Sequence, residues 1–137
     1  MTTHHSVIIE ADGGSRGNPG PAGFGSLLRD ADTGEVIAEA AEAIGRATNN
    51  VAEYRALLLG IERALELGAS ELDLVGDSEL VVKQVQGKYK VKDAGLKPLH
   101  AAVRKRLEGV GEWSIRHVRR ERNAEADRLV NEALDAA

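Results

Sequence analysis

The feature that most constrains the fold is a short apolar strand that ends in an aspartate and then breaks into a turn rich in glycine and proline. The stretch reads EADGGSRGNPGPAGFG over residues 10–25, and it follows the β-branched run VII at positions 7–9. A continuous run of this kind is typical of a central strand that is buried on both faces. We therefore predict a strand over residues 6–11, with Asp12 at its end. A carboxylate there loses part of its hydration, so it needs a metal ion or an arginine nearby.

The turn after Asp12 does not match the common phosphate-binding loops. It contains no Gly-Lys-Ser or Gly-Lys-Thr sequence, which excludes a nucleotide P-loop. A dinucleotide-binding fingerprint needs a helix after the glycines, whereas Pro19, Pro21 and the stretch 22–29 predict a turn that leads into a second strand.

The length of 137 residues suits one compact domain, 1–137, with little room for a second core. The chain has no cysteine, which excludes disulfides and thiolate metal sites. We expect residues 1–5, which include His4 and His5, to form a disordered and solvated tail. The sequence has neither an apolar run of membrane-spanning length nor a signal peptide, so we expect a soluble, cytoplasmic monomer that does not bind membranes.

Charge is divided unevenly along the chain. Residues 1–80 carry 5 Lys and Arg against 14 Asp and Glu, whereas residues 81–137 carry 13 against 8. Solvated helix faces alone can produce such a division. It is also consistent with a protein whose acidic half binds metal cations and whose basic half binds a polyanion.

Hydrophobic periodicity predicts a mixed α/β fold. The expected strands cover residues 6–11, 22–29, 35–43, 72–75 and 113–118, and the first three form an antiparallel meander. Apolar residues at spacings of three and four predict a long helix over 51–65. Further helices are expected over 78–86 and 96–107, and a last helix is expected after Asn123, which would cap it. A basic loop, 88–95, connects two of these helices.

Four carboxylates lie at the boundaries of predicted elements rather than on their polar faces. Asp12 ends the first strand, Asp77 follows the strand 72–75, and Glu53 and Asp127 lie in the first turns of helices. Strand ends and the neighbouring helix N-termini converge on one crevice in an open α/β sheet, so the four side chains could meet there. The alternative is that each favours its helix dipole or caps a helix without any ligand.

A dry cluster of four carboxylates would repel itself strongly unless cations were bound. Oxygen donors without thiols or clustered histidines favour magnesium or manganese over zinc. Two such ions about 4 Å apart form the arrangement known for in-line displacement at phosphorus.

Four segments resemble ribonuclease H of type 1 in their order and spacing, over nearly the whole chain. They are DGGSRGNPGPAG at 12–23, TNNVAE at 48–53, DS at 77–78 and NAEAD at 123–127. The first segment is long and specific, whereas Asp-Ser alone is a weak signal. The resemblance implies a ribonuclease H-like fold: a five-stranded mixed sheet in the order 3-2-1-4-5, with the first three strands antiparallel and helices on both faces.

The resemblance also implies an activity. In this family the positions of Asp12, Glu53, Asp77 and Asp127 bind two magnesium ions, for which manganese can substitute. The family cleaves the RNA strand of an RNA/DNA hybrid and leaves 5′-phosphate and 3′-hydroxyl ends. We expect the same metal-dependent endonuclease here, with the hybrid as its partner.

Family positions that contact the hybrid in its minor groove match Asn18, Asn49 and Asn50. An amide both donates to and accepts from a ribose 2′-hydroxyl, which distinguishes RNA from DNA. Asparagine is equally common in turns and caps, and both roles can hold. Thr48 resembles a family residue near a DNA phosphate, and Arg16 is placed to reach the backbone.

Two departures from the family pattern concern basic groups. The extra basic helix and loop of many members is shortened or absent, so Lys88, Lys90 and Lys92 would supply part of its phosphate contact. Weaker hybrid binding and a preference for manganese would follow. Members also carry a histidine in a flexible loop before the last helix, and Arg122 would take over its role by contacting a phosphate.

Two further residues leave the prediction open. His117 is expected to pack against the sheet or to face the groove rather than to act in catalysis. Glu10 shares a strand face with Asp12, so it is either a supporting acid or an exposed one. Two other functions remain compatible with the fold: a hybrid-binding module without catalysis, and a nuclease that acts on RNA duplexes or RNA-DNA junctions.

Overall fold

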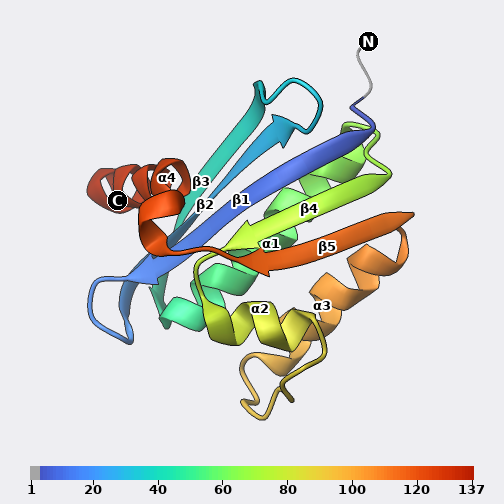
Figure 1. Ribbon diagram of the computed structural model, residues 1–137. Helices are drawn as coiled ribbons and strands as arrows, with labels where there is room; N and C mark the ends of the chain where they lie inside the picture. Colours follow the sequence, from blue (N-terminus) through green and yellow to red (C-terminus); the bar gives the residue numbers. More distant parts are fainter. Residues whose placement is uncertain (1–3) are drawn as a thin grey trace.

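The computed structural model describes residues 4–137 and contains one five-stranded mixed sheet (Figure 1). The strands are β1 (Ser6–Ser15), β2 (Gly20–Asp30), β3 (Val36–Ala47), β4 (Glu71–Gly76) and β5 (Glu112–His117). They lie in the order β3-β2-β1-β4-β5, with β2 antiparallel to both β1 and β3 and with β4 parallel to both β1 and β5. The fold predicted from the sequence is therefore confirmed.

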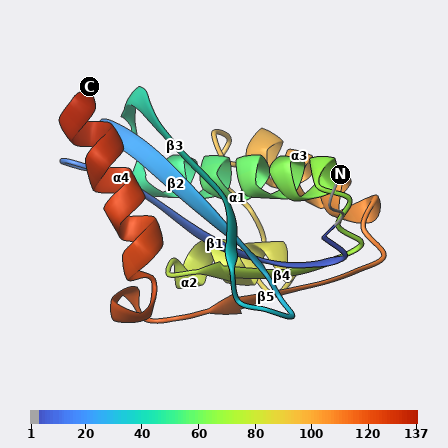
Figure 2. The same cartoon turned by 90° about the horizontal axis from the view of Figure 1, so that it is seen from above.

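Helices cover both faces of the sheet. The first three, α1 (Asn49–Glu66), α2 (Glu79–Val85) and α3 (Lys97–Glu108), contribute to one core, and α4 (Ala124–Ala136) lies on the opposite face (Figure 2). A short 3-10 turn, η1 (Arg120–Arg122), precedes α4. Within residues 4–137, no helix combines the length and the apolar character that a membrane span requires.

Apolar side chains from the sheet and from α1, α2 and α3 form the main core, and burying them is the chief source of stability. Its largest fully buried members include Tyr54, Phe24, Ile9, Leu28, Leu57, Ile61, Leu74 and Leu107. Hydrogen bonds to Gln84 add specific contacts between the helices on this side of the sheet. The Tyr54 hydroxyl lies 2.6 Å from Gln84 Oε1, and His100 Nε2 lies 3.0 Å from the Gln84 carbonyl oxygen. These contacts tie α1, α2 and α3 together.

Strand β1 is longer than predicted and is not covered equally on its two faces. It continues past Asp12 to Ser15 because β2 keeps pairing with it until Ser15 lies opposite Ala22. Ile8 and Glu10 are only partly buried, so the expected burial on both faces is wrong for this part of the strand. Within the described residues, no helix covers Ile8 and Glu10, because α4 packs mainly on β2 and β3.

The expected disorder of residues 1–5 is wrong for the last two of them. The His4 N–H donates to the Leu67 carbonyl at 3.0 Å, and His4 Nδ1 lies 2.8 Å from Asp30 Oδ2. The His5 carbonyl accepts from the Ser70 N–H at 2.9 Å. Residues 1–3 lie outside the described part of the chain.

The expected capping of α4 by Asn123 is also wrong in its chemistry. Asn123 occupies the N-cap position, but its side chain makes no hydrogen bond to the first turn of α4. Its Nδ2 instead donates to the carbonyl of Ala11 on β1, at 2.8 Å. A long-range contact has replaced the local one.

Candidate active site

Asp12 and Asp77 follow directly after the last paired residues of two parallel strands. The pairing of β1 with β4 ends where Ala11 lies opposite Gly76. The next residue on each strand is an aspartate, so the sheet itself sets the two carboxylates side by side. His117, at the end of β5, is exposed and lies beside Asp77. Its Nε2 is 3.2 Å from the Asp77 carbonyl oxygen.

Glu53 reaches the same place because α1 packs directly on the main chain of β1. A Cβ atom on Gly13 would lie 2.3 Å from the carbonyl carbon of Ala52, so only glycine permits this approach. The Gly13 N–H then donates to Glu53 Oε1 at 2.9 Å. Thr48 caps α1 by accepting from the Val51 N–H at 3.3 Å.

Asp127 comes from the opposite face of the sheet, in the first turn of α4. A Cβ atom on Gly25, the residue opposite Asp12 in β2, would lie 2.5 Å from Leu129 Cβ. The absence of that atom lets α4 approach. Arg120 Nη2 donates to Asp127 Oδ1 at 3.2 Å, and Asn131 Nδ2 lies 3.4 Å from Asp127 Oδ2.

The structure thus brings the four predicted carboxylates to one cleft of about 490 Å³. Oxygen atoms of Asp12, Glu53 and Asp77 lie within 4.8 Å of one another. Asp127 lines the same cleft, beside Arg120. Asp12 and Glu53 are almost fully buried, at 5% and 3% exposed.

Burial and mutual repulsion raise the pKa values of the two most buried acids. The pKa of Asp12 rises to about 8, chiefly because the carboxylate is desolvated and then because Asp77 is close. Burial also raises the pKa of Glu53, and the charges of Asp77 and Asp12 add to the effect. Without a cation, the cluster therefore favours protons over negative charge.

The donor set fits hard divalent cations. All four groups offer carboxylate oxygen, and the described residues include no cysteine and no histidine within the cluster. Asp77 Oδ2 is buried and has no hydrogen-bond donor among residues 4–137. A buried anionic oxygen without a donor is costly, and a coordinated cation removes that cost. Magnesium and manganese are the ions that such a site prefers.

The free energy of unfolding of the metal-free protein should fall as the pH rises from about 5 to 8. Over that range the unfolded chain ionises Asp12 near its ordinary pKa of 3.8, whereas the folded chain retains the proton up to a pKa of about 8. The unfolded state then binds fewer protons, so each pH unit costs up to about 1.4 kcal/mol for this group. Urea titrations at several pH values in chelator measure the slope. Excess magnesium should flatten it, and a rise in stability with pH would contradict the prediction.

The predicted substrate contacts divide into those inside and those outside the cleft. Asn49 and Asn50 line it, together with Ser15 and Arg16. Asn49 Oδ1 accepts from the Ser15 N–H at 2.8 Å, and Asn18 Oδ1 accepts from the Asn49 N–H at 3.2 Å. The asparagines therefore join the turn between β1 and β2 to the start of α1.

Of the two predicted arginines, Arg16 lines the cleft and Arg122 does not. Arg16 forms an ion pair with Asp135, with Nη2 2.6 Å from Oδ1. Arg122 does not line the acidic cleft. It lies at a separate depression on the uncovered sheet face, near Glu10 and Arg116. Arg120, which the prediction did not single out, occupies the cleft instead.

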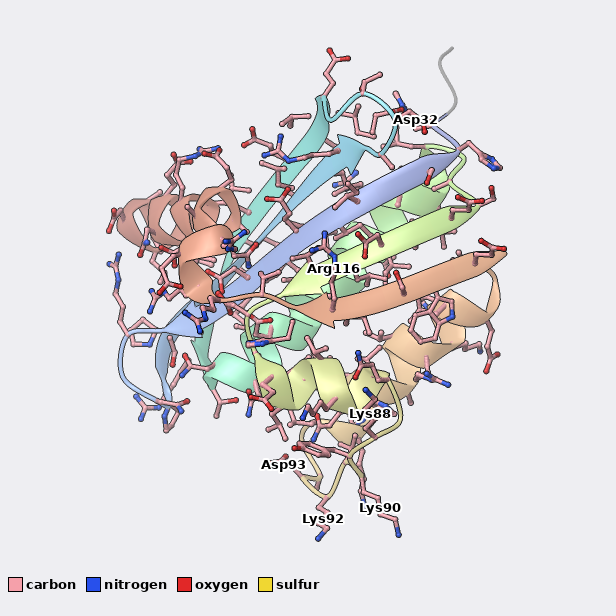
Figure 3. All side chains as sticks on the ribbon, viewed as in Figure 1. Asp32, Lys88, Lys90, Lys92, Asp93 and Arg116 are labelled. Carbon is pink, nitrogen blue, oxygen red and sulfur yellow. The ribbon has the colours of Figure 1, made fainter. Side chains whose placement is uncertain are left out.

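Lys88, Lys90 and Lys92 lie in the loop between α2 and α3, outside the residues that line the cleft, and Lys90 and Lys92 point away from the body of the molecule (Figure 3). Their loop is exposed, so an extended polyanion could reach them without entering the cleft.

The open question about Glu10 is resolved by its partner. Glu10 Oε2 lies 2.6 Å from Arg29 Nε, on the uncovered face of the sheet. It does not line the acidic cleft. Glu10 is therefore a half-buried partner of an arginine rather than a fifth member of the cluster.

Sequence reasoning missed Arg120 and Asn131, two side chains that donate hydrogen bonds to Asp127. Asn131 lies four residues after Asp127, so it shares a helical face with it, and that spacing could have identified it. Arg120 belongs to the run RRER at 119–122, in which the sequence alone does not distinguish one arginine from another.

Comparisons with known proteins agree on one family. The sequence model described as "Reverse transcriptase-like" matches residues 10–133. A protein of Mycobacterium tuberculosis described as a bifunctional protein is 51% identical over 131 residues, which cover 96% of this chain and 36% of the relative. The chain therefore spans about a third of the length of that curated relative.

Two solved structures are similar over almost their full length. The crystal structure of RNase H1 from the archaeon Halobacterium salinarum has a TM-score of 0.92 at 47% identity and covers 96% of this chain and 99% of that one. The crystal structure of LC11-RNase H1 in complex with an RNA/DNA hybrid has a TM-score of 0.89 at 43% identity and covers 95% of this chain and 97% of that one.

Proposed function

Because this chain belongs to the ribonuclease H type 1 family, we propose that it is a metal-dependent endoribonuclease that hydrolyses the RNA strand of RNA/DNA hybrids. The observation that carries the proposal is the cluster of Asp12, Glu53 and Asp77 within 4.8 Å, with Asp127 on the same cleft. A binding module without catalysis has no need to gather four mutually repelling acids and to bury two of them.

In this proposal the four carboxylates would hold two magnesium ions, or manganese ions in their place. The bound ions would lower the pKa of the attacking water and stabilise charge on the leaving oxygen, which leaves 5′-phosphate and 3′-hydroxyl ends. The protein would position the four carboxylates that hold the ions. The end of the β1–β4 pairing orients Asp12 and Asp77, the Gly13 N–H orients Glu53, and α4 carries Asp127.

The cleft also carries groups suited to recognising the RNA strand. Asn49 and Asn50 line it beside the acids, and Asn18 accepts a hydrogen bond from the Asn49 N–H. A ribose 2′-hydroxyl needs both a donor and an acceptor, and a side-chain amide supplies both. Recognition of a 2′-hydroxyl next to the acids would confine cleavage to RNA.

One assay tests the proposal. The purified protein is incubated with a strand-labelled hybrid in magnesium, in manganese and in chelator, and in parallel with an RNA duplex, an RNA-DNA junction and a DNA duplex. Cleavage of only the RNA strand of the hybrid, dependent on metal, supports the proposal. Cleavage of the RNA duplex or the junction would favour a same-fold nuclease of different specificity, and binding without cleavage would favour a silent binding module.

Replacing Asn18 and Asn49 together by alanine should reduce the preference for hybrid over DNA duplex by about tenfold or more, since two amide contacts to ribose would be lost. The measurement is the ratio of the two dissociation constants in calcium, which binds oxygen ligands without supporting rapid cleavage. A melting curve of the variant checks that the loss of the contacts to Ser15 and to the start of α1 has not unfolded the site. An unchanged ratio would remove these asparagines from recognition.

Replacing Lys88, Lys90 and Lys92 by glutamine should weaken hybrid binding at low salt and flatten its dependence on salt. The negative slope of log K against log salt should become shallower by about one for each lysine that contacts a phosphate. Lys105→Gln, on the exposed side of α3, removes a charge away from this loop and serves as the control. A slope that stays the same in the triple variant would place the hybrid elsewhere.

A further inference from the structure

Asn123 is a buried residue whose side chain forgoes its expected local role. It is 0% exposed and sits at the N-cap of α4, where asparagine normally accepts a hydrogen bond from the first turn. Here that bond is missing, and Oδ1 is buried without any donor among residues 4–137. An unused capping group and an unsatisfied acceptor both reduce stability. Such a conflict between local stability and the observed arrangement is typical of a functional site.

The contact that Asn123 does make lies next to the acids. Its Nδ2 donates to the Ala11 carbonyl at 2.8 Å, at the last residue of β1 that pairs with β4. The residue after Ala11 is Asp12, and the first turn of α4 after Asn123 carries Asp127. One hydrogen bond therefore connects the main chain beside one acid to the start of the helix that carries another.

A second anchor lies on the neighbouring strand. Gly25, opposite Asp12 in the register of β1 and β2, is in close contact with α4 at Ala126 and Leu129. This contact sets how near α4 lies to the sheet. Further along the helix, Leu134 packs against Gly23 and Arg128 pairs with Glu39. The bond from Asn123 adds a directional contact at the N-terminal end of α4, next to Asp12 and Asp127.

We infer that Asn123 is a positioning residue for the reaction: its amide fixes the start of α4 on β1 beside Asp12, so that Asp127 faces the other three acids. The inference rests on the proposed function, because Asp127 matters only if the cluster binds metal. Asn123 itself touches neither metal nor substrate in this role.

The test uses Asn123→Ser, which can still cap α4 but is too short to reach Ala11. The melting temperature in chelator should stay within about 5 °C of the wild type, since a cap is gained where a long-range bond is lost. The value of kcat/KM on the hybrid should fall about 10- to 100-fold, as is usual when a group that orients a metal ligand is removed. More Mn²⁺ should be needed to produce a given rise in melting temperature, which is a readout independent of activity.

A double-mutant comparison separates positioning from general weakening. If Asn123 acts through Asp127, then adding Asn123→Ser to Asp127→Asn should lower kcat/KM by no more than about twofold beyond Asp127→Asn alone. Val103→Ala, in the core on α3, is the control for stability. It should lower the melting temperature without changing the Mn²⁺ concentration needed for a given shift.

The outcomes are distinguishable. A wild-type protein that cleaves no hybrid overturns the proposed function, whereas active wild type with an equally active Asn123→Ser overturns this inference alone. Equal losses from Asn123→Ser in the wild-type and Asp127→Asn backgrounds would also overturn it. Asn123→Leu, which keeps a branched side chain and removes the donor without adding an ionisable group, serves if the serine variant does not fold. If neither variant folds, Asn123 is a structural residue and the inference is wrong.

Discussion

Asp12→Asn should abolish RNA cleavage while leaving the melting temperature of the metal-free protein unchanged or higher. Activity should fall at least about a thousandfold, because losing one ligand removes several kcal/mol of charge stabilisation in the transition state. Stability should not fall, since Asp12 is desolvated beside Asp77 and its pKa is raised to about 8. An asparagine there is neutral at every pH, so the folded chain no longer has to keep a proton on this side chain. Cleavage assays in magnesium and melting curves in chelator make the two measurements.

Glu10→Gln is the matched control for this substitution. Glu10 lies on β1 two residues before Asp12, but it pairs with Arg29 and does not line the cleft. The control should keep its activity and lose some stability, the reverse of the Asp12 variant. If Asp12→Asn instead unfolds the protein or leaves activity intact, the acidic cluster is not a metal site.

Gly13→Ala should destabilise the fold and remove most of the activity. The new Cβ would lie 2.3 Å from the Ala52 carbonyl carbon and 2.4 Å from the Glu53 nitrogen, both main-chain atoms that cannot rotate away. The start of α1 must therefore move, at a cost of about 1–3 kcal/mol typical of overpacking. Glu53 moves with it, and a displacement of about 1 Å in a catalytic group can cost about a hundredfold in rate. Urea unfolding and hybrid cleavage measure both effects.

Gly14→Ala provides the comparison one residue further along. A Cβ atom there would approach nothing closer than Asn49 Oδ1 at 3.9 Å, so the change should be tolerated. Equal effects of the two substitutions would mean that general flexibility of the turn matters and that the contact with α1 does not.

Much of the fold could be predicted because its signals are local. The β-branched run before Asp12, the three- and four-residue spacing after Asn50 and the turn residues between the strands each identify an element from neighbouring positions. The resemblance to a known family supplied the strand order, which periodicity alone does not contain. Element ends were less accurate, because they depend on partners: β1 continues to Ser15 only because β2 pairs with it.

The candidate site was likewise predictable in part. The four acids stood out by their places at element boundaries, but the resemblance to a known family was needed to identify them as one set. The structure brings them to one cleft. What surrounds them was not predictable, because it depends on contacts between distant segments. Asn123 bonds to Ala11 rather than capping its helix, and Arg120 rather than Arg122 reaches the cleft. The contact between His4 and Asp30 was not predicted either, because the two residues are distant in the sequence.

The hydrogen bond from the Gly13 N–H to Glu53 Oε1 has a consequence for how ions enter the site. A main-chain amide already holds this carboxylate in its inward orientation, so the side chain loses little rotational freedom when a cation arrives. The carboxylates are therefore gathered as the chain folds, and an incoming cation would displace the protons that the raised pKa values of Asp12 and Glu53 favour. Such a cage is preformed rather than induced, and its affinity for cations should depend more on desolvating the incoming ion than on rearranging the protein.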